Sequence, residues 1–483
     1  MKTKQLNELK KELETIITLL EQVVLPSDLN PIERKRASAQ NLLHYIAIRK
    51  IDVSGLQKQL KKIGASRLAR SEDHMLQSLY LLHRLVCGLL NVPDHLKKQK
   101  RITIARAEKK LNKNTKRLLG RKSRVKRVRL MVTMPSEAAN NYQMIEDFVV
   151  QGMNCARINC AHDTETEWIA MVEHIRKAAL KHNRFVTIAM DLSGPKIRTV
   201  LGSENLKYMT INEGDYIEII DDSEPILNIE KQLRCSFPDI ISKVKPGEHI
   251  YFDDGKIEGT IASVDAKKIG INIKRCKING EKLKTDKGIN LPESNLGIAG
   301  LTPKDKMDFA IIAKYADIVN FSFVNTTEDL EDLFQLMEFH NANNLGVILK
   351  IETKQAYNNL KDILLTTKTK TNAFGVMIAR GDLAIEVGWQ NIGRVQNEIL
   401  RMCTAAHTPV IWATQVLENL AKKGIPSRSE MSDINNALKA ECIMLNKGPY
   451  ILEVIQFLNE VLRNEESFQN KNEAMLPELK RLK

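Results

Sequence analysis

Short runs of β-branched residues alternate with helical stretches along most of the chain after Lys126, and this pattern constrains the fold more than any other feature. Such alternation is typical of parallel strands joined by crossover helices. In chain order the runs are Val128–Thr133, Cys155–Cys160, Phe185–Asp191, Asp317–Phe323, Val347–Glu352, Phe374–Ala379, Pro409–Ala413 and Glu441–Leu445. Eight strand–helix units close a TIM (β/α)8 barrel, so we expect an α/β fold of that class.

The interval between Arg198 and Lys287 interrupts this rhythm, because it contains strand patterns and turns but no helical stretch. Turn signals such as Asp254-Gly255 separate its strands. The expected strands are Tyr216–Ile220, His249–Phe252, Ile257–Val264 and Ile269–Ile273. We therefore expect a small β-barrel domain over residues 201–287, inserted after the third barrel strand, where it can cap the barrel mouth and exclude water.

The part of the chain before the barrel has helical patterns. An apolar stripe recurs every three or four residues at Leu6, Leu9, Leu13, Ile16, Leu20 and Val23. Such a stripe either pairs with another chain or packs inside its own helical domain. A second helical stretch carries Leu76, Leu79, Leu82, Leu85, Val86 and Leu89. We expect an all-helical, basic extension over residues 1–125, the barrel over 126–200 and 288–463, and a polar tail over 464–483.

The net charge of +14 is concentrated in one segment. Between Lys97 and Arg129 there are sixteen Lys or Arg residues and a single acid, Glu108. Such a run attracts polyanions, but a solvated helix or linker has the same composition. We favour the solvated helix and expect no nucleic-acid partner.

Seven cysteines are scattered along the chain without a CxxC pair. This usage is typical of reduced thiols in a reducing compartment, and we assign none of the cysteines to a metal. The N-terminal residues lack the apolar core of a signal peptide, and the apolar runs are too short to cross a bilayer. We therefore expect a cytoplasmic protein without a membrane partner.

Polar residues collect where the expected barrel strands end, which is the side on which TIM barrels place their active sites. They come from five different strands: Arg157, Asn159, Asp191, Lys196, Arg198, Lys350, Glu352, Arg380, Gly381, Asp382 and Thr414. Any single one is more often a helix cap or a salt-bridge partner. The constellation over five strands indicates an active site.

Lys350 and Glu352 stand two residues apart, so both side chains point to the same face of their strand, into the barrel. Glu352 and Asp382 can together hold a Mg2+ ion that keeps waters and takes substrate oxygens. Lys350, Arg157 and Arg198 supply positive charge for phosphates and developing oxyanions. This combination of metal, cations and positioning is suited to phosphoryl transfer.

Several sequence blocks resemble those of pyruvate kinase, in the same order, over residues 126–460. The blocks are Gly152-Met153-Asn154-Cys155-Ala156-Arg157-Ile158-Asn159, Gly194-Pro195-Lys196-Ile197-Arg198-Thr199 after Asp191, Asp253-Asp254-Gly255, Lys287-Gly288-Ile289-Asn290-Leu291-Pro292, Leu349-Lys350-Ile351-Glu352, Ala379-Arg380-Gly381-Asp382-Leu383-Ala384-Ile385-Glu386, Ala413-Thr414-Gln415-Val416-Leu417-Glu418 and Ser432-Asp433. The resemblance implies transfer of a phosphoryl group from phosphoenolpyruvate to ADP, giving pyruvate and ATP in glycolysis.

The resemblance also implies a role for each matching residue. Lys350, Arg157 and Thr414 are then catalytic, and Glu352 and Asp382 bind Mg2+ or Mn2+. Phosphoenolpyruvate is bound by Arg380, Gly381, Asp382, Thr414 and Ser322. The nucleotide side comprises Arg157, Asn159, His162, Arg198, Asp254 and Lys287.

The chain departs from the family pattern at several positions. The serine that usually ligates a monovalent cation is Ala161, and Asp163 replaces a small residue. Lys196 stands where the family has a glutamate, and we expect its ammonium, paired with Asp191, to substitute for K+. The loop after Leu445 is shortened and has lost the family's glutamate.

Three functions are open at this point. The first is an active pyruvate kinase-like enzyme, favoured by the retained residues of the site. The second is a catalytically weak relative that acts as a binding or scaffolding protein through its arm, favoured by Asp163 and the shortened loop. The third is a related barrel enzyme with a different enolpyruvate or keto-acid substrate. Because the sequence stops before the family's C-terminal domain, we expect no regulation by sugar phosphates, and a homo-oligomer supported by the arm.

Overall fold

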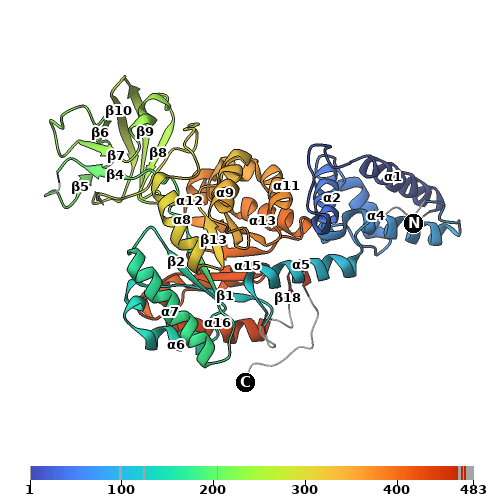
Figure 1. Ribbon diagram of the computed structural model, residues 1–483. Coiled ribbons are helices and arrows are strands. Elements are labelled where there is room, and N and C mark those ends of the chain that lie inside the picture. Colours follow the sequence, from blue (N-terminus) through green and yellow to red (C-terminus); the bar gives the residue numbers. More distant parts are fainter. Residues whose placement is uncertain are drawn as a thin grey trace.

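The computed structural model describes residues 2–96, 101–122, 126–203, 205–465, 469–471 and 473–474. Figure 1 shows a central barrel with a β insert on one side and a helical arm on the opposite side. Most of the expected tail over 464–483 lies outside the described residues, as do 97–100 and 123–125 of the basic segment. Within the described ranges, no helix is both long and apolar enough to span a membrane.

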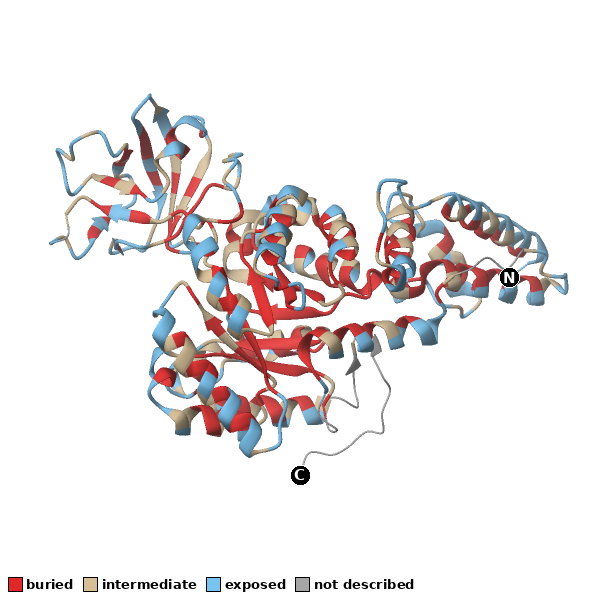
Figure 2. Ribbon diagram, viewed as in Figure 1, coloured by how far each residue is buried: buried red, intermediate tan, exposed pale blue. Residues whose placement is uncertain are grey.

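The expected TIM barrel is confirmed, since eight parallel strands close in the order β1-β17-β16-β15-β14-β13-β3-β2. The strands are β1 (Arg129–Thr133), β2 (Cys155–Asn159), β3 (Thr187–Asp191), β13 (Ile318–Phe321), β14 (Gly346–Ile351), β15 (Phe374–Ala379), β16 (Val410–Ala413) and β17 (Cys442–Leu445). Nearly all of their residues are buried, because side chains fill the interior and helices cover the outside (Figure 2).

Helices follow the barrel strands and bury one face against them. They are α6 (Tyr142–Val150), α7 (Glu165–Lys181), α8 (Pro303–Tyr315), α9 (Thr327–Phe339), α10 (Lys354–Asn358), α11 (Leu360–Lys370), α12 (Arg380–Val387), α13 (Trp389–Ala405), α14 (Glu418–Lys423), α15 (Arg428–Ala437) and α16 (Ile451–Glu465). Capping boxes at Thr302 and Thr326 begin α8 and α9, so both helices start at a defined residue above the barrel mouth.

The insert after β3 is a nearly closed seven-stranded sheet, ordered β12-β8-β9-β10-β6-β7-β4, with a separate β11-β5 pair. Its strands are β4 (Thr199–Leu201), β5 (Met209–Ile211), β6 (Tyr216–Ile220), β7 (Gln232–Cys235), β8 (His249–Phe252), β9 (Ile257–Val264), β10 (Lys268–Arg275), β11 (Glu281–Leu283) and β12 (Ile289–Asn290). A single bridge between Arg198 and Gly288 links the two edges of the sheet. The insert has a hydrophobic core of its own.

The arm is formed by α1 (Thr3–Glu21), α2 (Glu33–Ile48), α3 (Ser54–Lys62), α4 (Met75–Leu90) and α5 (Ile104–Leu119). The stripe from Leu6 to Leu20 is buried and α1 packs against α4, so the stripe finds its partner within this chain. Asn41 of α2 donates to Ala405 O at 2.8 Å, and His407 Nε2 lies 2.9 Å from Asp73 O. The arm and the barrel helices therefore share one continuous core.

Helix α5 runs from the arm to the end of the barrel opposite the active-site side (Figure 1). Its last residues, Leu118 and Leu119, are buried among inward-facing residues of the barrel strands. A Cβ atom at Gly346 or Gly375 would lie 2.7 or 2.6 Å from Leu118, so the absence of a side chain there lets the leucine approach. The arm thus plugs the N-terminal mouth of the barrel.

Candidate active site

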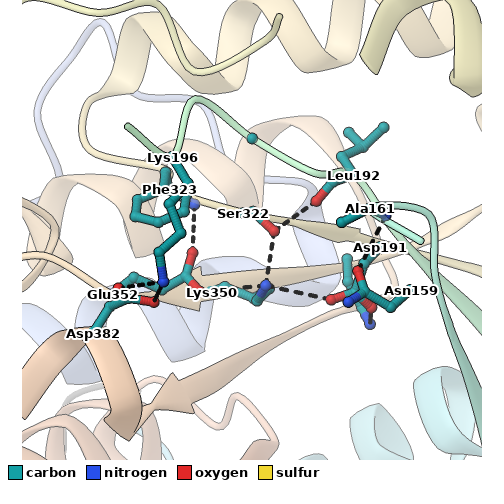
Figure 3. Close-up of polar contacts among 12 residues, drawn as sticks. Asn159, Ala161, Asp191, Leu192, Lys196, Ser322, Phe323, Lys350, Glu352 and Asp382 are labelled. Atoms are coloured by element: carbon teal, nitrogen blue, oxygen red, sulfur yellow. Dashed lines mark hydrogen bonds and ion pairs between the residues drawn. The ribbon is translucent and has the colours of Figure 1, made fainter. Parts of the chain in front are cut away.

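The polar residues expected at the barrel mouth converge on a buried cluster at the carboxyl ends of β2, β3, β13 and β14 (Figure 3). Asp191, at the end of β3, is fully buried. Arg157 makes a bidentate pair with it, with Nε 3.0 Å from Oδ1 and Nη2 2.7 Å from Oδ2. Asn320 of β13 donates to the same carboxylate at 2.6 Å. Burial alone favours the neutral acid, but Arg157 and Lys350 outweigh it and hold the pKa of Asp191 below its usual value.

Lys350 joins the two acidic parts of the cluster. Its Nζ lies 3.3 Å from Asp191 Oδ2 and 3.3 Å from Glu352 Oε1, and it donates to Ser322 Oγ at 2.7 Å. Ser322 Oγ in turn donates to Leu192 O at 2.6 Å. The ammonium is therefore held at a fixed position on the barrel axis side of β14, as the period of two along Lys350-x-Glu352 predicts.

Glu352 and Asp382 form the second acidic part. The pKa of Glu352 is raised above its usual value, mainly because the carboxylate is buried. The negative charge of Asp382 raises this pKa further, and the positive charge of Lys350 only partly offsets the two effects. Glu352 Oε2 is held by the backbone N–H of Phe323 at 2.7 Å. Asn290 donates to Asp382 Oδ1 at 3.4 Å. A buried and a partly buried carboxylate whose charges disfavour one another are a donor set that a divalent cation neutralises, so these residues fit Mg2+ or Mn2+.

Lys196 lies elsewhere than the sequence led us to expect. Its Nζ pairs with Asp382 Oδ1 at 2.9 Å and with Asp254 Oδ1 at 3.6 Å, whereas Asp191 pairs with Arg157 and Lys350. The expected Lys196–Asp191 pair is therefore wrong. Burial disfavours the ammonium, but Asp382 and Asp254 outweigh it and raise the pKa of Lys196. The extra positive charge stands beside the carboxylates that fit a divalent cation.

Arg380 and Thr414 mark the ends of β15 and β16. The Arg380 guanidinium donates to the carbonyls of Ala413 and Thr414, pairs with Asp433 and lies over the Trp412 ring. The Arg380 side chain thus holds the loop after β16 in place. The Thr414 backbone is left-handed, with φ 63°, and its buried Oγ1 has no hydrogen-bond partner among the described residues. A hydroxyl in this state is available to a ligand or a water.

Gly381 lies in the first turn of α12, and the space where its Cβ would stand is open. No side chain caps the N-terminus of this helix in the described structure. The first N–H groups of α12 are thus not capped by the preceding side chain, and such uncapped groups at a helix N-terminus can receive an anion.

The residues expected on the nucleotide side fall into two groups. Arg157, Asn159 and His162 stand at the end of β2 or just after it: Arg157 joins the Lys350 cluster through Asp191, Asn159 accepts from the Ala161 N–H at 3.3 Å, and His162 is exposed.

The second group lies in the insert and its connections to the barrel. Arg198 pairs with Asp286 at 3.1 Å, Lys287 pairs with Asp253 at 3.1 Å, and Asp254 pairs with Lys196 at 3.6 Å. These three side chains do not contact Lys350.

Sequence reasoning missed Asn320 and Asn290. Asn320 stands two residues before Ser322 in an otherwise apolar strand, so both side chains lie on one face of the strand. Two polar residues at this spacing could have predicted that Asn320 belongs to the site. Asn290 belongs to β12, an edge strand of the insert's sheet, and also donates to Glu386 Oε1 at 3.2 Å. Burial raises the pKa of Glu386 to about 7.

Comparison with known proteins gives a consistent result. A family model described as "Pyruvate kinase, barrel domain" matches residues 125–451. The pyruvate kinase of Geobacillus stearothermophilus is 30% identical over 356 residues, which cover 72% of this chain and 59% of that protein. The pyruvate kinase of Staphylococcus saprophyticus is 30% identical over 340 residues, covering 69% and 56%. The chain thus spans less than two thirds of the length of these relatives.

Proposed function

Because this chain belongs to the pyruvate kinase family, we propose that it transfers the phosphoryl group of phosphoenolpyruvate to ADP. The bond between phosphorus and the enol oxygen breaks, a bond to a β-phosphate oxygen of ADP forms, and protonation of the enolate at carbon gives pyruvate. The observation that carries the proposal is the Lys350 ammonium, buried between Asp191 and Glu352 at the barrel mouth.

Lys350 stabilises negative charge on the transferring phosphoryl group and on the enolate oxygen. Preorganised charge is effective here because the ammonium is already desolvated and held by three partners. Arg157 supports the same region, and its bidentate pair with Asp191 keeps the guanidinium in a fixed orientation.

Glu352 and Asp382 hold the divalent cation. When bound, Mg2+ or Mn2+ neutralises phosphate charge and orients the reacting oxygens. The N–H groups at the start of α12, with Ser322, bind the substrate, its carboxylate facing Arg380, Gly381 and Asp382. The unpartnered Thr414 hydroxyl takes part in the relay that delivers a proton to the enolate carbon.

The nucleotide lies between the barrel mouth and the insert. Arg157, Asn159 and His162 line the barrel side, and Arg198, Asp254 and Lys287 line the hinge side. Arg198 and Lys287 then exchange their carboxylate partners for phosphate oxygens.

Catalysis proceeds without K+. Ala161 offers no hydroxyl to a monovalent cation, and the Asp191 carboxylate is already neutralised by Arg157 and Lys350. Lys196 adds a further fixed ammonium to the barrel mouth, beside Asp382 and Asp254. The assay in tetramethylammonium buffer, with and without K+, tests this, and strong activation by K+ contradicts it.

The second candidate is a catalytically weak relative with a binding or scaffolding role. Two observations favour it: Asp163 adopts a left-handed conformation beside the expected nucleotide side, with φ 64°, and the loop Asn446-Lys447-Gly448-Pro449 lacks the family's glutamate. A coupled assay with phosphoenolpyruvate and ADP separates the two. Pyruvate formation that requires both substrates and Mg2+ supports the enzyme, and its absence supports the scaffold.

Cytoplasmic location and a homo-oligomeric state stay predictions from the sequence. Fractionation of cells that express the full chain measures the first, and light scattering on the assayed sample measures the second.

A further inference from the structure

A second cluster of ligand-type side chains lies in the arm, far along the chain from the barrel mouth. His83 and Cys87 stand one turn apart on the same face of α4, and Asp94 follows the end of that helix. Their ligating atoms all lie within 4.8 Å of one another. His83 and Cys87 are almost fully buried, at 1% and 2% exposure, so the cluster is an interior feature of the arm.

The spacing of these atoms is close to that of a tetrahedral metal centre. Asp94 Oδ1 lies 3.2 Å from His83 Nδ1. Cys87 Sγ lies 3.8 Å from Nδ1 and 3.7 Å from Nε2, so the sulfur is about equally far from both ring nitrogens. Zinc bonds of about 2.0–2.1 Å to nitrogen and oxygen and about 2.3 Å to sulfur put such ligand pairs roughly 3.3 and 3.5 Å apart at a tetrahedral angle. Rotation of the imidazole or the thiol is needed to direct Nδ1, Sγ and the Asp94 oxygen, which lie within 4.8 Å of one another, at one ion.

The other face of the imidazole supplies an independent observation. His83 Nε2 lies 3.1 Å from Glu14 Oε1 on α1, and Glu14 is itself held by Lys10 at 2.7 Å. A histidine that binds a metal through one ring nitrogen usually donates the other N–H to a carboxylate. Glu14 can accept a hydrogen bond from the Nε2 proton and so leave Nδ1, which faces Asp94, to a metal ion. The remaining oxygen of Asp94, Oδ2, faces Arg84 at 3.5 Å.

We propose that His83, Cys87 and Asp94 bind a Zn2+ ion, with Glu14 as the positioning residue behind the histidine. A nitrogen, a thiolate and a single carboxylate oxygen favour zinc over Mg2+ or Ca2+, which prefer oxygen ligands. Three protein ligands leave the fourth position to a water molecule. The ion thus links α4 to the segment that follows it, which carries Asp94. The contact between His83 and Glu14 extends this link to α1.

The test uses the full-length protein with Zn2+ or Co2+ as the only added metal besides excess Mg2+. We expect about one zinc per chain after dialysis, and a thiolate-to-cobalt charge-transfer band on Co2+ substitution. Cys87→Ser abolishes that band, while the control Cys276→Ser, at a partly exposed cysteine of the insert, keeps both the band and the stoichiometry. Glu14→Gln keeps the band but weakens zinc affinity about 10–100-fold.

The charge-transfer band separates this site from the carboxylates at the barrel mouth, which offer no sulfur. His83→Gln and Asp94→Asn provide variants that keep the side-chain volume, and circular dichroism checks that each is folded. Absence of bound zinc in the folded wild-type protein overturns the proposal. An unchanged band in folded Cys87→Ser does so too.

Discussion

Lys350 shows how one side chain depends on several strands. Its ammonium rests between Asp191 of β3 and Glu352 just after β14, and a hydroxyl of the intervening strand region, from Ser322, completes the set. Each carboxylate has a second partner, Arg157 or the Phe323 N–H. Removal of the ammonium therefore deletes a positive charge from the proposed active site, while Asp191 and Glu352 each keep a hydrogen-bond donor.

We expect Lys350→Met to lower kcat by about 10²–10³-fold or more while the fold is kept. Steady-state assays with phosphoenolpyruvate and ADP measure the loss, and thermal unfolding checks the fold. Lys274→Met, on an exposed position of β10, is the matched control and should have wild-type kinetics. Wild-type turnover in Lys350→Met would refute the assignment.

Lys196 gives a second prediction at this scale. Replacing it with glutamate removes the ammonium beside Asp382 and places a third carboxylate near Asp382 and Glu352. We expect Lys196→Glu to lower activity without K+ by about tenfold or more, and to gain a partial response to added K+. Lys196→Gln, which removes the charge without reversing it, distinguishes loss of the ammonium from added repulsion. Full activity of both variants in tetramethylammonium buffer contradicts the proposed role.

The sequence predicted which residues gather at the mouth but not how each side chain pairs. Strand ends and the period of two locate Lys350, Glu352 and Asp191 well. The path of the chain after β3 was not predictable from the sequence. Gly194 turns the chain there in a left-handed conformation, with φ 71°, and lies close to Ser322. That turn carries Lys196 away from Asp191 to Asp382, and a linear pattern does not encode it.

At the scale of elements, α5 acts as part of the barrel. Leu118 fills the end of the barrel above Gly346 and Gly375. We expect Leu118→Ala to lower the free energy of unfolding by about 2–5 kcal/mol, because it leaves a cavity with little room to collapse. Ile104→Ala on the same helix, where the side chain is 49% exposed, should change it by less than about 0.5 kcal/mol. Urea denaturation measures both, and equal effects would argue against the plug.

The junction of α2 and α11 contains two buried lysines, Lys35 and Lys368, whose ammonium groups both lie near the Phe374 ring, at 5.4 and 4.9 Å from its centroid. Burial, with repulsion from neighbouring cations, lowers the pKa of Lys35 from 10.5 to about 7. Between these two values the unfolded chain binds more protons than the folded chain. Stability conferred by this junction therefore rises with pH from about 7 to 10.5 and is lowest below pH 7.

We expect Lys35→Met to flatten that rise by a few kcal/mol, at about 1.4 kcal/mol per unit of pKa. The gain in stability over wild type is largest below pH 7. Denaturation curves at several pH values between 6 and 9.5 measure it, with exposed Lys11→Met as the control. Parallel pH profiles of Lys35→Met and wild type would contradict the prediction.

All eight barrel strands were predictable from β-branched runs, because buried parallel strands are apolar throughout. The partner of the α1 stripe was not, since a stripe has the same spacing whether it faces another chain or α4. In α4 the apolar pattern predicts more burial than the structure has. Leu85 and Leu89 belong to the pattern, yet their side chains are 45% and 52% exposed. Periodicity identifies a face but not what covers it.

Over the whole molecule, the insert and the arm relate differently to the barrel. The insert has its own core and is connected through the chain segments around Arg198 and Lys287. We propose that it moves as a cap over the mouth, as a domain on two connecting strands can. The arm instead shares the core of the barrel helices, so it is expected to move with them.

The plug formed by Leu118 and Leu119 has a consequence for how the chain folds during synthesis. These residues leave the ribosome before any barrel strand, and their last partners, on β17, are made only after the other seven barrel strands. An apolar helix end that stays exposed until its binding site has formed can make non-native contacts during folding. The core that α1 builds with α4 can form early from neighbouring sequence, and it gives α5 a stable base from which to receive the closing strands.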